Sequence, residues 1–375
     1  MLKYFPIILL IFQSLEIENV YFTKNITSSS MVKIFKKLNV SLKGNIGLKI
    51  HTGEKGGKYF LSPDFLQEIY DYTNGTFIEC NTAYRGNRHT TDLHKELLEI
   101  NGWKKNNRRI VIMDEDPKLD FNLTITNHEM ISENIVGSHL NDFDSCLVLS
   151  HLKGHSMGGF GGALKQLSIG FASQAGKAWI HSAGVTTKWE EAFTKGTSQE
   201  NFTAAMGDAA SSIVEYFRNK GGIAFINVMA NISKSCDCAG ARAPAPKIHD
   251  IGILASVDPI ALDKACLDLI KNNEDIGTED WLNQLNRLKG ENTIFIGEKN
   301  NIGSQKYNFI DIDKDNTSDT NDGKKEEGIN LLTLIVILSL LFSLIIIGGI
   351  IGYIIYKKRK NQNIEIDRLT DEENK

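Results

Sequence analysis

Histidines, lysines and glycines are concentrated in one stretch of the sequence, from residue 151 to residue 165, and a further histidine follows at 181. Imidazole groups transfer protons near neutral pH and bind soft or borderline metals, so several of them on converging loops favour catalysis or metal binding. Exposed glycine amides can bind an anion, and a neighbouring lysine adds a positive charge or a nucleophilic amine. The residues concerned are His151, Lys153, His155, Gly158, Gly159, Gly161, Gly162, Lys165 and His181.

The same pattern has plainer explanations. Glycines mark tight turns without any ligand, and a lone histidine is usually a satisfied core or surface residue. The glycines do not match a dinucleotide-binding fingerprint, because Leu164 stands where that motif requires a third glycine. The stretch therefore predicts a site for a small-molecule ligand or an anion without specifying which.

Two of the five cysteines, Cys236 and Cys238, are separated by a single residue, whereas Cys80, Cys146 and Cys266 stand alone. An odd and sparse set does not indicate a disulfide framework. The close pair is too near for a relaxed disulfide but suits a metal site or a redox pair with a third group; two partly buried thiols in a turn are the alternative. Because no C-x-x-C-x-x-C run occurs, an iron-sulfur cluster has no ligand set in this sequence.

The elements that would position these residues alternate between strand and helix from about residue 25 to residue 310. Such alternation predicts an α/β fold with a largely parallel sheet and flanking helices, in one lobe or two. The predicted strands are Ile46–Ile50, Thr76–Cys80, Arg109–Met113, Cys146–Ser150, Ile223–Met229, Ile251–Ala255 and Thr293–Ile296. The predicted helices are Phe65–Tyr72, Thr91–Ile100, Ala204–Arg218, Pro259–Asn272 and Glu279–Leu288.

Four loops that follow predicted strands carry most of the reactive side chains. They begin at His51, Asn81, His151 and Asn231. In α/β sheets, ligands bind beyond the carboxyl ends of the strands. We therefore expect these four loops to meet at one edge of the sheet and to form the site there.

The overall composition excludes several classes of protein. With 41% hydrophobic and 23% charged residues, the chain is not disordered or disulfide-dense, and its net charge of −4 gives no electrostatic basis for binding nucleic acid. Neither paired carboxylates for glycoside hydrolysis nor a G-x-S-x-G nucleophile motif is evident.

The two ends of the chain predict a single-pass membrane protein. Residues 331–356 contain no charge and, at about 1.5 Å per residue, are long enough for a transmembrane helix. A basic tail (357–375) follows this helix and an acidic stalk (311–330) precedes it, which places the 20–310 domain outside, at the cell surface or in a lumen. The N-terminus (1–19) is predicted to be a signal peptide; the alternative is a first strand in a tail-anchored cytosolic protein.

Several segments resemble the family called domain of unknown function 362: HTGEKGGKYFLSPDF, IECNTAYRGNRHTT, DSCLVLSHLKGHSMGGFGGALKQLSIGFAS and DIGILASVDPIALDKAC. The resemblance covers about Val20 to Ile310. Members of that family are often described as iron-sulfur proteins because many carry an inserted ferredoxin module. This sequence lacks the module, so the resemblance does not extend to a cluster.

Two segments also resemble the lactate racemase family: GNRHTTDLHKELL and HSMGGFGGALKQLSIG. That resemblance implies a nickel-pincer nucleotide tethered to Lys165, a nickel ligand at His181, and His89 and His155 as acid and base on a 2-hydroxy acid. Around His89 the order differs, because Arg88 precedes the histidine where the family has an arginine after it.

Two hypotheses follow from these patterns. In the first, the domain is a racemase-like or epimerase-like enzyme that uses Lys153, Lys165 and the glycines to bind a cofactor. In the second, it is a non-catalytic module that binds a metal through Cys236 and Cys238 or an anion through the glycines. A receptor-type ectodomain is a third and less specific alternative.

Overall fold

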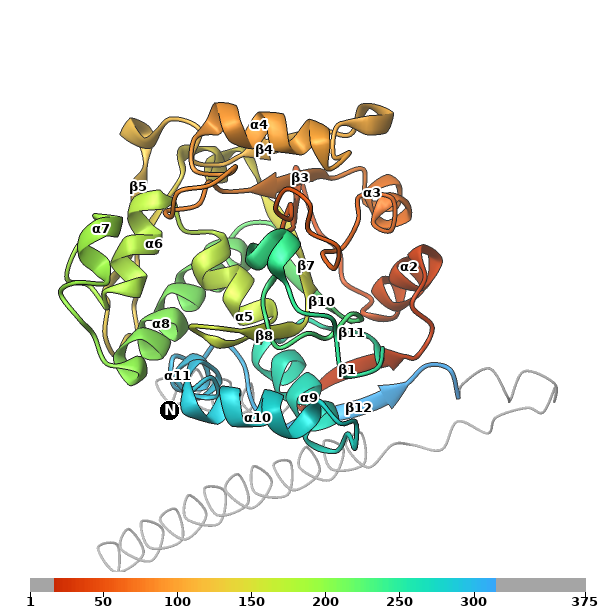
Figure 1. Cartoon of the computed structure of the whole chain (residues 1–375). Helices are drawn as coiled ribbons and strands as arrows, with labels where there is room; N and C mark the ends of the chain where they lie inside the picture. Colours follow the sequence, from red (N-terminus) through yellow and green to blue (C-terminus); the bar gives the residue numbers. More distant parts are fainter. Residues whose placement is uncertain (1–16, 315–375) are drawn as a thin grey trace, which may run out of the picture. The chain divides into compact units, whose positions relative to one another are not determined.

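An eight-stranded sheet runs through residues 17–314, the part of the chain that the computed structural model describes (Figure 1). The strand order is β12-β1-β11-β10-β7-β2-β3-β4, and two further sheets have two strands each, β5-β6 and β8-β9. The strands are β1 (Glu18–Thr23), β2 (Ile46–Lys49), β3 (Thr76–Glu79), β4 (Ile110–Ile112), β5 (Phe121–Thr124), β6 (Glu133–Val136), β7 (Ser145–His151), β8 (Lys153–His155), β9 (Gly159–Gly161), β10 (Ile223–Met229), β11 (Gly252–Ser256) and β12 (Tyr307–Asp311).

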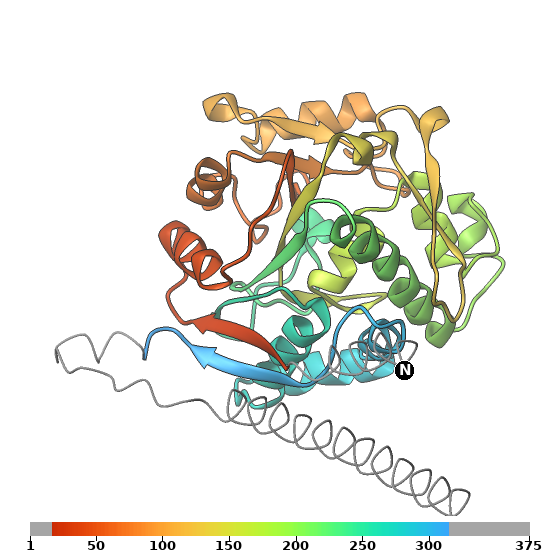
Figure 2. The ribbon, with the colours of Figure 1, turned by 180° about the vertical axis from the view of Figure 1, so that it is seen from behind.

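Helices cover both faces of the large sheet (Figures 1 and 2). Alternate residues of a strand point to opposite faces, so Leu147 and Leu149 of β7 pack with α2 and α3, whereas Cys146 and Val148 pack with α8 and α9. The helices are α2 (Ser28–Lys37), α3 (Gln67–Thr73), α4 (Thr91–Ile100), α5 (Ala163–Lys165), α6 (Gln174–His181), α7 (Trp189–Ala192), α8 (Gln199–Arg218), α9 (Pro259–Lys271), α10 (Thr278–Arg287) and α11 (Asn292–Lys299). The predicted α/β class with flanking helices is confirmed.

Helix starts follow from capping residues in the sequence. Helix α4 begins after Thr90, whose side chain accepts a hydrogen bond from the amide of Leu93, and it occupies the predicted residues. Helix α9 begins at Pro259. The side chain of Asp258, the residue before it, accepts hydrogen bonds from the amides of Ile260 (2.7 Å) and Ala261 (2.9 Å). Local signals therefore determine where these helices begin.

The prediction of a strand at Thr293–Ile296 is wrong, because these residues lie in helix α11. A short β-branched run has no periodicity of its own, and packing decides its conformation. Thr293, Ile294, Ile296 and Gly297 are buried at helical spacing, and Thr293 donates to the carbonyl of Thr203 in α8 (3.1 Å). Packing against α8 therefore favours a helix at these residues.

The large sheet is mostly parallel but mixed. Strand β11 pairs antiparallel with both β10 and β1, while the other five pairings are parallel. All described residues fall in one compact unit. The described part of the chain therefore forms one lobe and not two.

The first and last strands, β1 and β12, lie side by side. Asp313, just after β12, accepts hydrogen bonds from the Thr23 hydroxyl (2.8 Å) and the Lys24 amide (2.9 Å). The fold thus extends from Glu18 to Asp313, slightly beyond the predicted 20–310 at both ends.

The membrane-related predictions concern other parts of the chain. No helix within residues 17–314 is both long and apolar enough to cross a bilayer. The predicted transmembrane helix (331–356), the cytoplasmic tail, most of the acidic stalk and most of the signal peptide lie outside the described residues.

Candidate functional site

A cavity of about 310 Å³ lies at the carboxyl ends of the parallel strands. Strands β3 and β4 follow β2 on one side of the sheet, whereas β7 and β10 lie on the other side of β2. A reversal of strand order leaves a crevice at the carboxyl ends, where ligands bind in open α/β sheets. His51 after β2, Cys80 after β3, His151 at the end of β7 and Cys238 beyond β10 all line this cavity. The predicted convergence of these loops is confirmed.

Lys165, at the end of α5, is the least satisfied charged group of the cavity. Within residues 17–314, no hydrogen bond or ion pair reaches its amine. Burial, together with the positive charges of Lys153 and Arg88, lowers the pKa of Lys165 from 10.5 to about 7. A buried amine that is partly neutral at pH 7 can act as a nucleophile, and its protonated form would attract an anion.

A buried network of four charged side chains includes Glu79 and Arg88, which line the cavity. Glu79, at the end of β3, accepts from Lys49 and from Arg88 (3.1 Å), and Arg88 also donates to Glu54 (2.8 Å). Burial alone would raise the pKa of Glu79, but Lys49 and Arg88 outweigh it and lower that pKa. These two carboxylates balance two cations, so the lysines Lys165 and Lys177 leave the cavity with excess positive charge.

Asp237 anchors the turn between the two neighbouring cysteines. Its carboxylate accepts from His151 Nδ1 (3.0 Å) and from the amine of Lys153 (2.5 Å), while His151 Nε2 donates to the carbonyl of Ala230 (2.6 Å). Burial raises the pKa of Asp237, but the nearby charges of His151 and Lys153 lower it well below its usual range. The turn is therefore held against β7 and β8 by a buried ionised group.

The proton on His155 can be assigned from its partners. Its Nδ1 accepts hydrogen bonds from the amides of Met157 (3.2 Å) and Gly158 (2.9 Å), so the neutral ring carries its proton on Nε2. Burial and the charge of Lys165 lower the pKa of His155 well below its usual range. His155 therefore faces the cavity as a neutral hydrogen-bond donor.

His181 lines the cavity and lies among three aromatic rings. Its ring stacks on Phe202, with centroids 4.5 Å apart, and meets the edges of Trp189 and Phe193. Burial and the charge of Lys165 lower the pKa of His181 to about 3. Its buried Nδ1 has no hydrogen-bond partner within the described residues.

The structure brings most predicted site residues together. Lys153, His155, Gly161, Gly162, Lys165, His181 and Cys238 line the cavity. His89 does not: Arg88 takes the place in the wall, and the buried His89 Nδ1 has no partner among the described residues. The assigned roles of these residues stay predictions.

Only two residues of the glycine stretch, Gly161 and Gly162, line the cavity, and their predicted role in binding an anion stays a prediction. Asp263 of α9 accepts hydrogen bonds from the amides of Ala163 and Leu164, both at 2.9 Å, so a carboxylate of the chain itself occupies the start of α5. Gly158 and Gly159 lie outside the cavity, and Gly159 has a positive φ of 79° where the chain passes close to Gly290. Close packing explains Gly158 and Gly159 better than ligand binding does.

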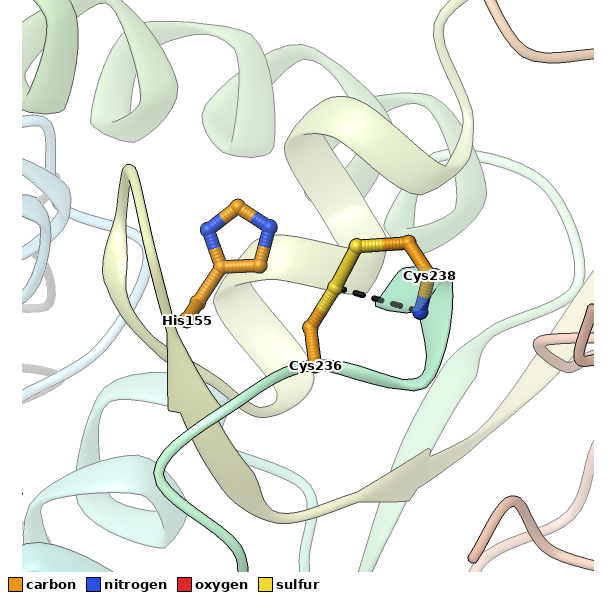
Figure 3. Close-up of side chains that lie close together, drawn as sticks. All are labelled: His155, Cys236 and Cys238. Atoms are coloured by element: carbon orange, nitrogen blue, oxygen red, sulfur yellow. Dashed lines mark hydrogen bonds between the residues drawn. A yellow bond between two sulfur atoms is a disulfide. The ribbon is translucent and has the colours of Figure 1, made fainter. Parts of the chain in front are cut away.

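Cys236 and Cys238 form a disulfide, with Cα atoms 5.2 Å apart (Figure 3). A ring nitrogen of His155 and the two sulfurs lie within 4.8 Å of one another. In this oxidised form the sulfurs are not thiolates and cannot serve as the predicted metal ligands. The sequence predicted a third group beside the two cysteines for a metal site or a redox pair, and His155 lies at that position.

Sequence reasoning missed Glu79, Lys177 and Asp237 as parts of the site. Asp237 carried a signal, because it stands between the two cysteines. Glu79 and Lys177 carried none, because no motif marks them and only the fold brings them to the cavity. The partner of Glu79, Lys49, is 30 residues away in the sequence.

A family model described as a domain of unknown function (DUF362) matches residues 46–268. The chain belongs to the DUF362 family. The matched part of this DUF362 chain runs from β2 to α9 and contains every side chain of the cavity described above. No curated protein is significantly similar to the chain.

Two solved structures resemble the chain distantly. One is a Thermotoga maritima protein from a structural genomics consortium, with 14% identity and a TM-score of 0.37, covering 72% of this chain and 58% of its own. The other is the lactate racemase apoprotein of Thermoanaerobacterium thermosaccharolyticum, with 12% identity and a TM-score of 0.39, covering 67% and 56%. The chain thus spans little more than half the length of either, and neither likeness is close enough to inform its function.

Proposed function

We propose that the cavity is the active site of an enzyme that attaches an anionic cofactor to Lys165 and transfers protons to and from a small hydroxy acid. The observation that carries the proposal is the Lys165 amine, buried at the cavity with a pKa of about 7 and without a partner in the described residues. A buried cation without a counter-charge is costly, so its retention indicates a ligand that compensates it.

The residues present fit a metal-bearing nucleotide such as the nickel-pincer nucleotide at two points. Lys165 offers an amine for a covalent bond, and His181, which lines the cavity as a neutral imidazole, offers a ring nitrogen for a metal. When bound, that group would supply the electrophilic centre that abstracts and returns the hydrogen on the substrate carbon.

The chain's own residues would bind and orient the substrate. Because Lys165 would hold the cofactor, Lys177 is the lysine left to attract the substrate carboxylate, and burial in the cavity excludes water and strengthens that attraction. His155 is suited to donate a proton or a hydrogen bond to the hydroxyl oxygen, because its Nε2 carries the proton and its Nδ1 is already occupied.

The direct test is production of the full-length chain together with enzymes that synthesise the nickel cofactor. We expect about one nickel per chain and a mass adduct on the peptide that contains Lys165, both lost in Lys165→Met. Lys177→Met is the matched control, because Lys177 also lines the cavity but its amine already donates to the carbonyl of Ala172. A metal-free chain without an adduct, or an adduct that persists in Lys165→Met, would refute the proposal.

A second test needs no cofactor synthesis. Pyridoxal 5′-phosphate is an anionic aldehyde that forms a Schiff base with neutral amines, and borohydride reduction fixes the product. At pH 7 we expect Lys165 to be labelled before any other lysine, because its lowered pKa leaves about half of the amine neutral. Uniform labelling of exposed lysines, with Lys165 unmodified, would contradict the assignment.

A further inference from the structure

The disulfide between Cys236 and Cys238 lies at the cavity, and its two sulfurs differ in access. Cys238 lines the cavity, whereas Cys236 is only 3% exposed. Figure 3 shows both sulfurs facing the ring of His155. A thiol that enters the cavity would therefore reach the sulfur of Cys238 and not that of Cys236.

A purely structural role explains this disulfide poorly. A disulfide stabilises a fold mainly by restricting the unfolded chain, and the effect is smallest when the closed loop is shortest. Here one residue separates the two cysteines, and that residue, Asp237, already holds the turn through His151 and Lys153. The turn does not need the covalent bond to keep its place.

The surroundings favour breaking and remaking the bond. The Cys236 sulfur accepts a hydrogen bond from the amide of Cys238 (3.2 Å), which would stabilise Cys236 as a leaving thiolate. The His155 Nδ1 faces the amides of Met157 and Gly158, so the ring edge that faces the sulfurs carries the proton on Nε2. That N–H can donate to a thiolate.

We propose that Cys236 and Cys238 form a reversible thiol–disulfide couple that exchanges with a small thiol bound in the cavity. The incoming thiolate forms a bond to the Cys238 sulfur, the Cys236–Cys238 bond breaks, and its electron pair leaves with Cys236 as a thiolate. A second thiolate then attacks the mixed disulfide, which releases the small molecule as its disulfide and leaves Cys238 as a thiolate. The protons of the two incoming thiols end on Cys236 and Cys238, so one protein disulfide is reduced for one small-molecule disulfide formed.

The same three residues in reduced form resemble a metal site, but the histidine is poorly arranged for one. A metal-bound histidine normally donates its other ring N–H to a carbonyl or carboxylate. The Nδ1 of His155 instead faces two N–H donors, so Nε2 cannot lose its proton to a metal without a rearrangement of the loop at Gly158. The geometry thus favours the couple, which depends neither on Lys165 nor on a bound cofactor.

The couple is tested on the purified full-length chain in glutathione buffers of varied ratio, with alkylation and mass spectrometry to count thiols at each cysteine. We expect Cys236 and Cys238 to shift together and reversibly between disulfide and dithiol. Cys80, Cys146 and Cys266 are internal controls that should stay unreacted, because all three are buried and burial raises the pKa of each thiol. A pair that stays oxidised until the chain is unfolded would overturn the proposal.

Single substitutions test the direction of attack. Cys236→Ser should form a mixed disulfide with glutathione at least about tenfold faster than Cys238→Ser, because only Cys238 faces the cavity. His155→Leu should slow the exchange of the wild-type pair and alter its dependence on pH, whereas His155→Gln, which keeps an N–H donor, should restore most of the rate. Equal rates in the two serine variants would refute the assignment, as would stoichiometric zinc binding to the reduced pair that requires His155.

Discussion

Lys165→Met is the substitution whose effect on stability follows most directly from the structure. The pKa of Lys165 is lowered from 10.5 to about 7 by burial and by the charges of Lys153 and Arg88. A lowered pKa means that protonation costs free energy in the folded chain. The unfolded chain therefore binds more protons between pH 7 and 10.5, so stability rises with pH across that window, and the cost is fully present below it.

The magnitude follows from the two pKa values. Each tenfold difference in proton affinity corresponds to about 1.4 kcal/mol. The lowered pKa of Lys165 therefore costs the folded chain about 4 kcal/mol at pH 7 and about 2 kcal/mol at pH 9, where the buried amine has given up the proton that the unfolded chain keeps. Methionine has a similar length and no charge, and it removes this cost. We expect Lys165→Met to be more stable than wild type at pH 7, by an amount that falls by about 2 kcal/mol on going to pH 9.

The assay is urea denaturation of the full-length chain and the variant at pH 7, 8 and 9, followed by tryptophan fluorescence. All four tryptophans lie within the described fold, so the signal reports on its unfolding. Lys177→Met is the control, because that amine has a carbonyl partner. If Lys165→Met is less stable than wild type at pH 7, or if the difference does not change with pH, Lys165 is not an unpaired buried amine.

Four other substitutions test the site and the fold around it. Asp237→Ala leaves the buried Lys153 amine without its carboxylate and His151 Nδ1 without its acceptor, and should lower the free energy of unfolding by about 4 kcal/mol; a loss below about 1 kcal/mol in urea titration would contradict the anchoring role. Asp258→Ala, at the buried start of α9, should cost about 2 kcal/mol and Thr27→Ala, at the exposed start of α2, about 1 kcal/mol; calorimetry that ranks them the other way would refute the capping argument. Gly154→Ala places a Cβ against the Lys234 carbonyl and should cost about 3 kcal/mol, so unchanged thermal unfolding would show that the loop can shift.

Local signals in the sequence were enough for much of the fold. The capped helix at Thr91–Ile100 and the apolar runs that became β2, β3, β4, β7, β10 and β11 were all recognisable. Elements whose stability comes from a partner were not: β1 and β12 support each other at the sheet edge, and α11 depends on α8. Partners far apart in sequence leave no periodic pattern that a local reading can detect.

Within the site, the sequence by itself determined which chemical groups are present and that loops after β2, β3 and β7 would meet. Residue type and strand order suffice for that, because parallel strands end at a common edge. Only the tertiary structure decided which of these groups are free. It placed Asp263 on the amides of Ala163 and Leu164, paired Arg88 with two carboxylates and joined Cys236 to Cys238. Within residues 17–314 it left the Lys165 amine without a partner. The physical reason is that availability for chemistry depends on burial and on the nearest charge, and both are set by residues distant in the chain.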